Sequence, residues 1–225
     1  MAKRHIPIVD RIREGIHSGR FVPGQRLIEA DLTEEFGASR SKIREAFRRL
    51  EADRLIEIRK NRGASVRGIS RKEVVDTLVV LGAVALTIVV TVAGRADTRG
   101  VRRRIEQSLQ AARGFRQRIG QLDDARAYMN ENARFWDVLT ELCDNPVLAE
   151  TRLRLETTLF RLALEGSRIT ARKDRWIVRH EEILRAILDG RGALVRKLVT
   201  ESVNEVRDAI LALPDGAFAP PKEAR

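Results

Sequence analysis

The sequence is poor in the residues that build most catalytic, metal and redox sites. Its 225 residues include one cysteine and three histidines. A lone cysteine, Cys143, cannot form a disulfide within the chain and is typical of a reducing compartment. The sequence also lacks a glycine-rich phosphate loop and a nucleophile elbow. We therefore expect a protein that is not an enzyme.

Aromatic residues make up 4% of the chain, too few for a platform that stacks the bases of single-stranded nucleic acid. The N-terminal residues lead into an amphipathic pattern without the apolar core of a secretory signal. We therefore expect a cytoplasmic protein.

One long apolar run complicates that expectation. The 18 residues from Thr77 to Gly94 carry no charge, which is the usual threshold for a membrane span. The alternative is a helix buried on most of its circumference, in a core that also meets a dimer partner. No Trp or Tyr belt flanks the run, so we favour the buried helix and expect no membrane partner.

Positive charge is concentrated at one end of the chain. The net formal charge is +11, and residues 1–72 hold 18 Lys and Arg against 10 Asp and Glu, a net +8. The remaining residues share a net +3. This asymmetry predicts a module that binds a polyanion, joined to a second part of nearly balanced charge.

The basic third has the pattern of a winged helix-turn-helix. Apolar residues at helical spacing predict helices over 8–18, 29–36 and 41–54. Alternating residues then predict two short strands, 55–59 and 64–67, joined by a turn. In this arrangement the third helix enters the major groove of double-stranded DNA.

The candidate DNA-contacting side chains lie on that third helix and on the wing. Arg40 and Arg44 are one turn apart, so both guanidinium groups can meet guanine edges. The complete set is Ser39, Arg40, Ser41, Lys42, Arg44, Arg48, Arg62 and Gly63.

The run Ser39–Glu51, followed by Gly63–Val66, resembles the winged helix of GntR-family regulators over about residues 6–70. Lys42 stands where that family frequently has proline at the start of the helix. The resemblance implies DNA-contact roles for Arg40, Arg44 and Gly63.

The rest of the chain reads as helix. We expect helices over residues 72–94, 99–122, 125–142, 146–165, 176–188 and 192–213. The predicted fold class is mainly α, with a winged helix-turn-helix domain (1–72), an all-helical bundle (73–213) and a flexible tail (214–225).

Phe135, residues 145–148 and residues 180–190 are similar to landmarks of the FCD domain, the ligand-binding domain of the FadR subfamily of GntR regulators. Many FCD domains hold a metal through four side chains. By resemblance, the four positions are Asn132, Trp136, His180 and Ser202. Only His180 is a good ligand for a transition metal, so we expect no metal and no other cofactor.

The same four side chains are candidates to line an effector cavity directly. Arg161 is a further candidate, as a clamp for a carboxylate. Leu81 and Ala85 replace an Arg and a Glu that are frequent in the family, which suits a more hydrophobic effector, or none. The alternative is that Trp136 simply fills the cavity.

These observations predict a homodimeric transcription regulator that binds a palindromic operator, with a small organic acid or a related hydrophobic compound as effector. The resemblance favours repression. A second hypothesis is a constitutive, architectural DNA-binding protein whose C-terminal domain only dimerises.

Overall fold

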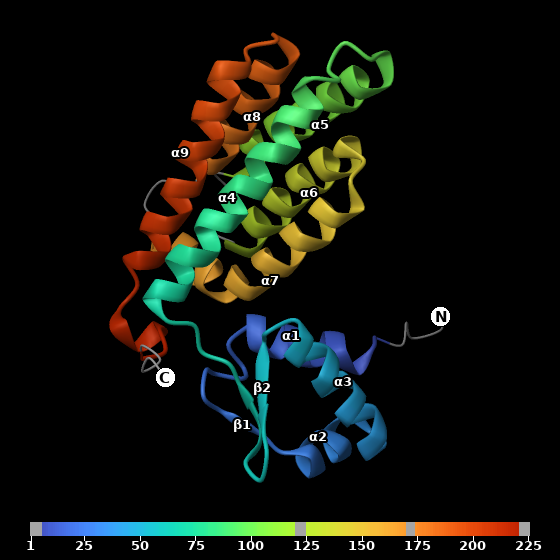
Figure 1. Ribbon diagram of the computed structural model, residues 1–225, viewed down its shortest axis with the longest axis vertical. Helices are drawn as coiled ribbons and strands as arrows, with labels where there is room; N and C mark the ends of the chain where they lie inside the picture. Colours follow the sequence, from blue (N-terminus) through green and yellow to red (C-terminus); the bar gives the residue numbers. More distant parts are fainter. Residues whose placement is uncertain (1–5, 120–124, 170–173, 221–225) are drawn as a thin grey trace. The chain divides into compact units, whose positions relative to one another are not determined.

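The computed structural model describes residues 6–119, 125–169 and 174–220 (Figure 1). Its contacts divide the chain into two compact units. The first, the N-terminal unit, is Met1–Lys72 together with Thr157–Arg161 and Asp215–Arg225. The second, the helical unit, is Glu73–Glu156 together with Leu162–Pro214.

The N-terminal unit begins with three helices, α1 (Ile8–His17), α2 (Glu29–Phe36) and α3 (Arg40–Ala52). Their apolar stripes meet in one core, in which Ile12, Ile43 and Leu50 are fully buried. The predicted helices are therefore present, and α3 begins one residue earlier than expected. Burial of this apolar face stabilises three helices that are individually too short to persist in water.

A small sheet completes this unit. It has the order β1 (Arg26–Leu27), β3 (Gly63–Val66), β2 (Ile56–Arg59), and both pairings are antiparallel. Strands β2 and β3 are the predicted wing. The two-residue strand β1 was not predicted, because two residues show no alternation.

The helical unit contains α5 (Arg99–Ile119), α6 (Ala125–Cys143), α8 (Asp174–Leu188) and α9 (Gly192–Leu211), with most of α4 (Arg71–Ala93) and α7 (Pro146–Ile169). Residues 71–72 of α4 and 157–161 of α7 group with the N-terminal unit. The described parts of these helices pack around a core that includes Ile88, Ile105, Leu139 and Ile183. The predicted bundle is thus present, and α7 continues past residue 165, where the sequence analysis ended it.

Local sequence explains the sharp turn before α7. The Oδ1 atom of Asn145 accepts hydrogen bonds from the backbone N–H groups of Val147 and Leu148, both at 3.1 Å. Pro146 occupies the first helical position, where its missing N–H costs no hydrogen bond. Asp144 takes a positive φ of 56°, which reverses the chain out of α6.

Helix α4 is the uncharged run of the sequence analysis. It is long and apolar enough to cross a membrane, but length and composition are the only support for that, and such evidence is weak. Only 28% of its most apolar window is buried, so it is less enclosed within one chain than expected. Its buried stripe faces the core, and its other side, including Val79 and Val80, is exposed.

Residues 214–220 of the predicted tail have defined contacts, and residues 221–225 lie outside the described part of the chain. Residues Asp215–Ala217 form a short 3₁₀ helix. The backbone N–H of Ala219 donates to the carbonyl of Ile69 at 3.0 Å, and Arg71 binds the carboxylate of Asp215 at 2.8 Å. Phe218 lies under the guanidinium of Arg71. Neither the backbone pairing nor this cation–π contact can be inferred from the composition of the segment.

Candidate DNA-binding surface and sensing site

The turn before α3 places the recognition helix. Gly37 ends α2 in the left-handed conformation, with φ 59°, which a residue with a side chain adopts at a cost. Ser39 is the N-cap of α3, and its Oγ accepts a hydrogen bond from the N–H of Lys42 at 3.4 Å. This cap fixes the start of the helix, and the free N–H groups of the first turn are available to a phosphate.

The outer face of α3 is basic and open. Ile43, Phe47 and Leu50 point into the core, and the predicted contact residues occupy the opposite side. All eight predicted DNA-contacting residues are exposed: Ser39, Arg40, Ser41, Lys42, Arg44, Arg48, Arg62 and Gly63. The fold thus presents this set to solvent, as DNA binding requires.

Arg44 is held by a partner that the sequence analysis missed. Its Nε lies 3.0 Å from both carboxylate oxygens of Glu29, in the first turn of α2. The hydrogen bond, and then the negative charge of Glu29, raise the pKa of Arg44 above its ordinary value. These bonds use only Nε, so the N–H donors of the two Nη groups are not taken up by Glu29.

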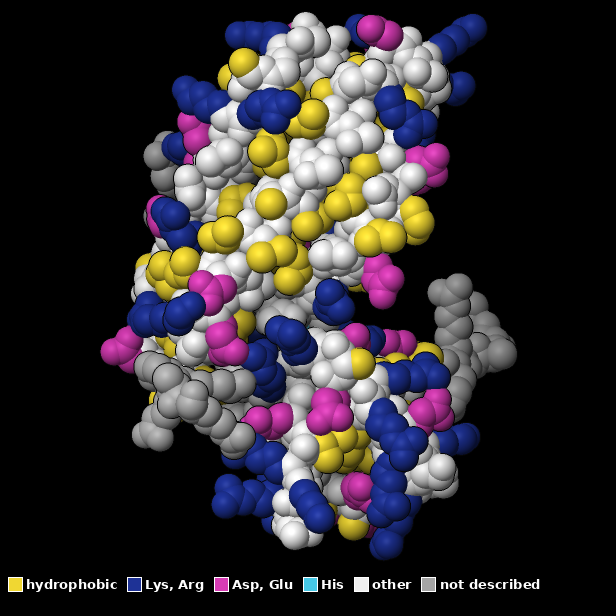
Figure 2. Space-filling model, in the orientation of Figure 1, with side chains coloured by type: hydrophobic (Ala, Val, Ile, Leu, Met, Phe, Trp, Pro, Cys, Tyr) yellow, Lys and Arg dark blue, Asp and Glu magenta, His cyan; other side chains and the backbone are white. Residues whose placement is uncertain are grey.

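The wing turn is tight. Asn61 and Gly63 have positive φ angles of 62° and 76°, and the N–H of Arg62 donates to the carbonyl of Arg59 at 3.0 Å. A Cβ on Gly63 would lie 3.6 Å from the guanidinium of Arg26 on β1. The exposed Arg26 therefore adds a positive charge beside the wing. Figure 2 shows Lys and Arg side chains over much of the visible surface of the N-terminal unit.

In the helical unit, aromatic rings on α6 and α8 form a small stack. Phe135 lies flat on His180, with centroids 4.0 Å apart, and meets Trp136 edge to face at 5.1 Å. His180 is 3% exposed, and its Nδ1 has no hydrogen-bond partner among the residues that the structure describes. Burial lowers the pKa of His180 to about 3, so the imidazole is neutral at physiological pH.

Arg152 on α7 lies on the other side of this stack. Its side chain is 3% exposed, and its guanidinium lies 5.5 Å from the ring centroid of Trp136. It is paired with Glu156 and, at 3.5 Å, with Asp137. Burial raises the pKa of Glu156, although the charge of Arg152 opposes that effect. The Nε of Arg152 has no partner in the described part of the chain.

The five predicted effector residues have different surroundings. Trp136 and His180 are buried and are linked through Phe135. Asn132 on α6 and Ser202 on α9 are half-buried. Arg161 groups with the N-terminal unit, where its Nη2 donates to the carbonyl of Ala217 at 2.9 Å. It is therefore separated from the other four by its contacts.

The donor set does not fit a metal. Among residues 6–119, 125–169 and 174–220, no three His, Cys, Asp or Glu side chains are grouped so that they could hold an ion. At the four positions taken from the FCD resemblance, His180 stacks on Phe135 and an indole stands where a ligand would be needed.

Comparison with known proteins places both units. Residues 7–66 match the family described as bacterial regulatory proteins of the gntR family, and residues 73–205 match the FCD domain. The galactonate operon transcriptional repressor of Escherichia coli K12 is 30% identical over 163 residues, which span 67% of this chain and 71% of that protein. The chain belongs to the GntR family. It is a DNA-binding transcription regulator with an FCD domain.

Two further likenesses extend over most of this GntR-family chain. The transcriptional repressor RspR of Escherichia coli K12 is 26% identical and covers 88% of this chain and 85% of its own. The solved structure of E. coli McbR/YncC has a TM-score of 0.75 at 17% identity and covers 94% of this chain and 98% of its own. The latter likeness shows the fold alone.

Three residues in this GntR regulator escaped the sequence analysis. Arg26 and Glu29 are brought to the wing and to α3 by tertiary folding. Arg152 is one of many arginines in the chain, and the sequence around it, Thr151–Arg154, does not mark it as buried. No sequence signal identifies the partners of Arg26 or Glu29, which lie on other elements.

Proposed function

We propose that this GntR-family regulator binds a palindromic operator as a homodimer, in the cytoplasm, and that an effector in its helical unit changes operator binding. The central support is the open basic face of α3, with Arg40 and Arg44 one turn apart and the wing beside them. Repression is the favoured sign, since the two curated relatives described above are named repressors.

The homodimer is supported by the exposed side of α4. Val75, Val79, Gly82 and Leu86 line a groove of about 300 Å³ together with α9, where Val203 faces them. Val79 is 69% exposed, and the helix carries no charge after Asp76. Figure 2 shows hydrophobic side chains across the visible face of this unit. A second copy would remove this apolar surface from water, and a two-fold operator requires two copies.

For the effector we propose a small organic acid with an apolar body, bound without metal beside Trp136 and His180. Asn132 and Ser202 would supply further polar contacts. The buried guanidinium of Arg152 is paired with Glu156 and Asp137, but its Nε has no partner among the described residues and would donate one hydrogen bond to the carboxylate. Neutral His180 would donate or accept one hydrogen bond through its unpartnered Nδ1.

One observation favours the second hypothesis, a constitutive architectural protein. Trp136 is 8% exposed and belongs to the core cluster of the bundle, so the indole fills space that an effector would need. A thermal-shift screen of carboxylates separates the two functions. An effector raises the unfolding temperature and changes operator affinity, and Arg152→Gln weakens both effects. If no carboxylate raises the unfolding temperature or changes operator affinity, the constitutive architectural function is favoured.

Operator contact is tested by Arg40→Ala and Arg44→Ala. Loss of one bidentate base contact should weaken binding to the selected operator on the order of 10- to 100-fold and reduce discrimination between operator and random DNA. Fluorescence anisotropy at fixed salt measures both. Arg103→Ala, an exposed arginine on α5, is the control with the same loss of charge. Equal affinities for all four proteins would remove α3 from the interface.

A further inference from the structure

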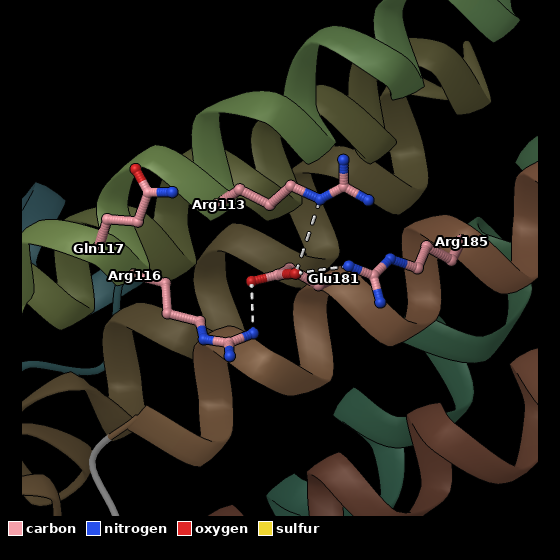
Figure 3. Close-up of a pocket in the computed structure, with 5 residues that line it drawn as sticks. All are labelled: Arg113, Arg116, Gln117, Glu181 and Arg185. Carbon is pink, nitrogen blue, oxygen red and sulfur yellow. Dashed lines mark hydrogen bonds and ion pairs between the residues drawn. The ribbon is translucent and has the colours of Figure 1, made fainter.

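A second concentration of arginines lies in the helical unit, between α5 and α8 (Figure 3). Arg113, Arg116 and Gln117 from α5 and Glu181 and Arg185 from α8 line a cavity of about 290 Å³. We call it the arginine pocket. Its volume lies just below the range of roughly 300–1,000 Å³ for drug-sized ligands, so it suits a smaller ligand. It is separate from the aromatic stack, because His180 points into the core while the neighbouring Glu181 faces α5.

The floor of the arginine pocket is one buried carboxylate. The side chain of Glu181 is 2% exposed. Its Oε1 accepts from Nη1 of Arg116 at 3.3 Å, and its Oε2 accepts from Nη2 of Arg185 at 3.0 Å. The Nε of Arg113 lies 3.8 Å from Oε2. As Figure 3 shows, the three arginines approach Glu181 from different sides.

The arginines around Glu181 bring more positive charge and more N–H donors than its one carboxylate can balance or accept. Three guanidinium groups and one carboxylate leave two positive charges in the pocket. Each guanidinium has five N–H donors, whereas one carboxylate accepts about four hydrogen bonds. The arginine side chains are 41%, 51% and 50% exposed, so their remaining donors reach the open side of the cavity. Glu181 thus keeps the three guanidinium groups close together, and its single negative charge leaves a net charge of about +2 there.

We propose that the arginine pocket binds a small oxyanion with two negative charges, the phosphate group of a phosphorylated small molecule. A phosphate dianion balances the two excess charges, and its oxygens accept from several guanidiniums at once. Glu181 positions the arginines beneath it, which reduces the entropy lost on binding. Gln117 lines the rest of the cavity and is the donor available to the organic part of the ligand. This site goes beyond the proposed operator and effector functions.

The test is calorimetric titration of the full-length protein with inorganic phosphate, glycerol 3-phosphate and glycerol, at constant ionic strength. Both phosphates should bind saturably, and glycerol should not. In Arg116→Gln and Arg185→Gln the dissociation constant should rise at least about tenfold, as expected for one charge-assisted contact. Arg103→Gln, with the same change of charge on the exposed part of α5, should bind like the wild type.

Two further variants guard against loss of folding. Arg185→Lys keeps the charge and should still weaken binding several-fold, because a lysine cannot donate a planar pair of hydrogen bonds. Gln117→Ala leaves the charge unchanged and should weaken only glycerol 3-phosphate. The absence of saturable phosphate binding to the wild type, or equal binding to wild type, Arg116→Gln and Arg185→Gln, would overturn the proposal.

Discussion

Glu29 and Arg44 lie fifteen residues apart on different helices, and their side chains meet at the edge of the proposed DNA-binding surface. The carboxylate binds Nε and so limits the rotation of a long, exposed side chain. The Nη donors keep a fixed direction relative to α3. A preoriented guanidinium loses less entropy when it meets a base. We therefore expect Glu29 to position Arg44 for DNA binding.

Replacement of Glu29 by Gln should lower the ratio of operator affinity to random-DNA affinity. Random-DNA affinity itself should rise slightly, because one negative charge near the phosphates is removed. Anisotropy with both DNAs at several salt concentrations measures the two effects. Glu45→Gln, which removes the partner of Arg49 on the same helix, is the matched control. An unchanged ratio in Glu29→Gln would show that Arg44 needs no such support.

His180 couples the stability of the helical unit to pH. Its pKa is lowered from 6.5 to about 3 by burial, so in the folded protein it stays neutral between these values while the unfolded chain takes up a proton. The unfolded state therefore gains stability as pH falls from about 6.5 toward 3. Above about pH 6.5 both states are neutral, and the contribution is constant.

The matched variant is His180→Phe, which retains a ring on Phe135 and cannot titrate. The difference in unfolding free energy between wild type and variant should be constant above pH 7 and should then fall with decreasing pH, by up to about 1.4 kcal/mol per unit. Urea unfolding followed by tryptophan fluorescence gives this difference. Parallel pH curves for the two proteins would mean that His180 titrates normally in the folded state.

Among the elements, those with strong periodicity could be predicted from the sequence. Ile43, Phe47 and Leu50 define the inner stripe of α3, and Asn145–Pro146 marks the start of α7. Features without a local sequence pattern could not be predicted. Strand β1 is two residues long and exists only because β3 pairs with it. The burial of Arg152 and the Glu29–Arg44 contact depend on which helices meet, and no local pattern contains that information.

Helix α4 is a further case in which the sequence does not predict which residues are buried. Its sequence is apolar on every side after Asp76, so periodicity cannot reveal which side faces the core. The fold assigns the buried stripe to residues such as Val74, Leu78 and Ile88 and leaves Val79 and Val80 in solvent. Apolar exposure of this kind is typical of a surface that a partner covers.

Val79→Asp should therefore convert the proposed dimer into a monomer, because burying a carboxylate among the apolar side chains of α4 costs several kcal/mol. Light scattering after size exclusion measures the mass. Val147→Asp is the control, since Val147 on α7 is 71% exposed and lies outside the groove. A Val79→Asp protein that remains dimeric would move the interface away from α4.

At the scale of the whole molecule, the proposed functions of the two units rest on different observations. The winged helix is defined by its charge, its core and an exposed contact set, and the chain matches its family there and in the FCD domain. The helical unit has the family's bundle. Trp136 and His180, two of the four positions at which the resemblance implied a metal, lie in a buried aromatic stack, and Arg152 lies beside Trp136. We therefore expect the ligand of this unit to be an anion that arginine side chains bind without a metal.

The most direct test of a dimeric reader of operator DNA is hydroxyl-radical footprinting of the full-length protein on the genomic fragments that it selects. We expect two protected half-sites related by a dyad, with contacts in successive grooves from α3 and the wing. Arg40→Ala and Arg44→Ala should lose both half-sites together. A single protected segment without symmetry, or protection unchanged by these substitutions, would contradict the account.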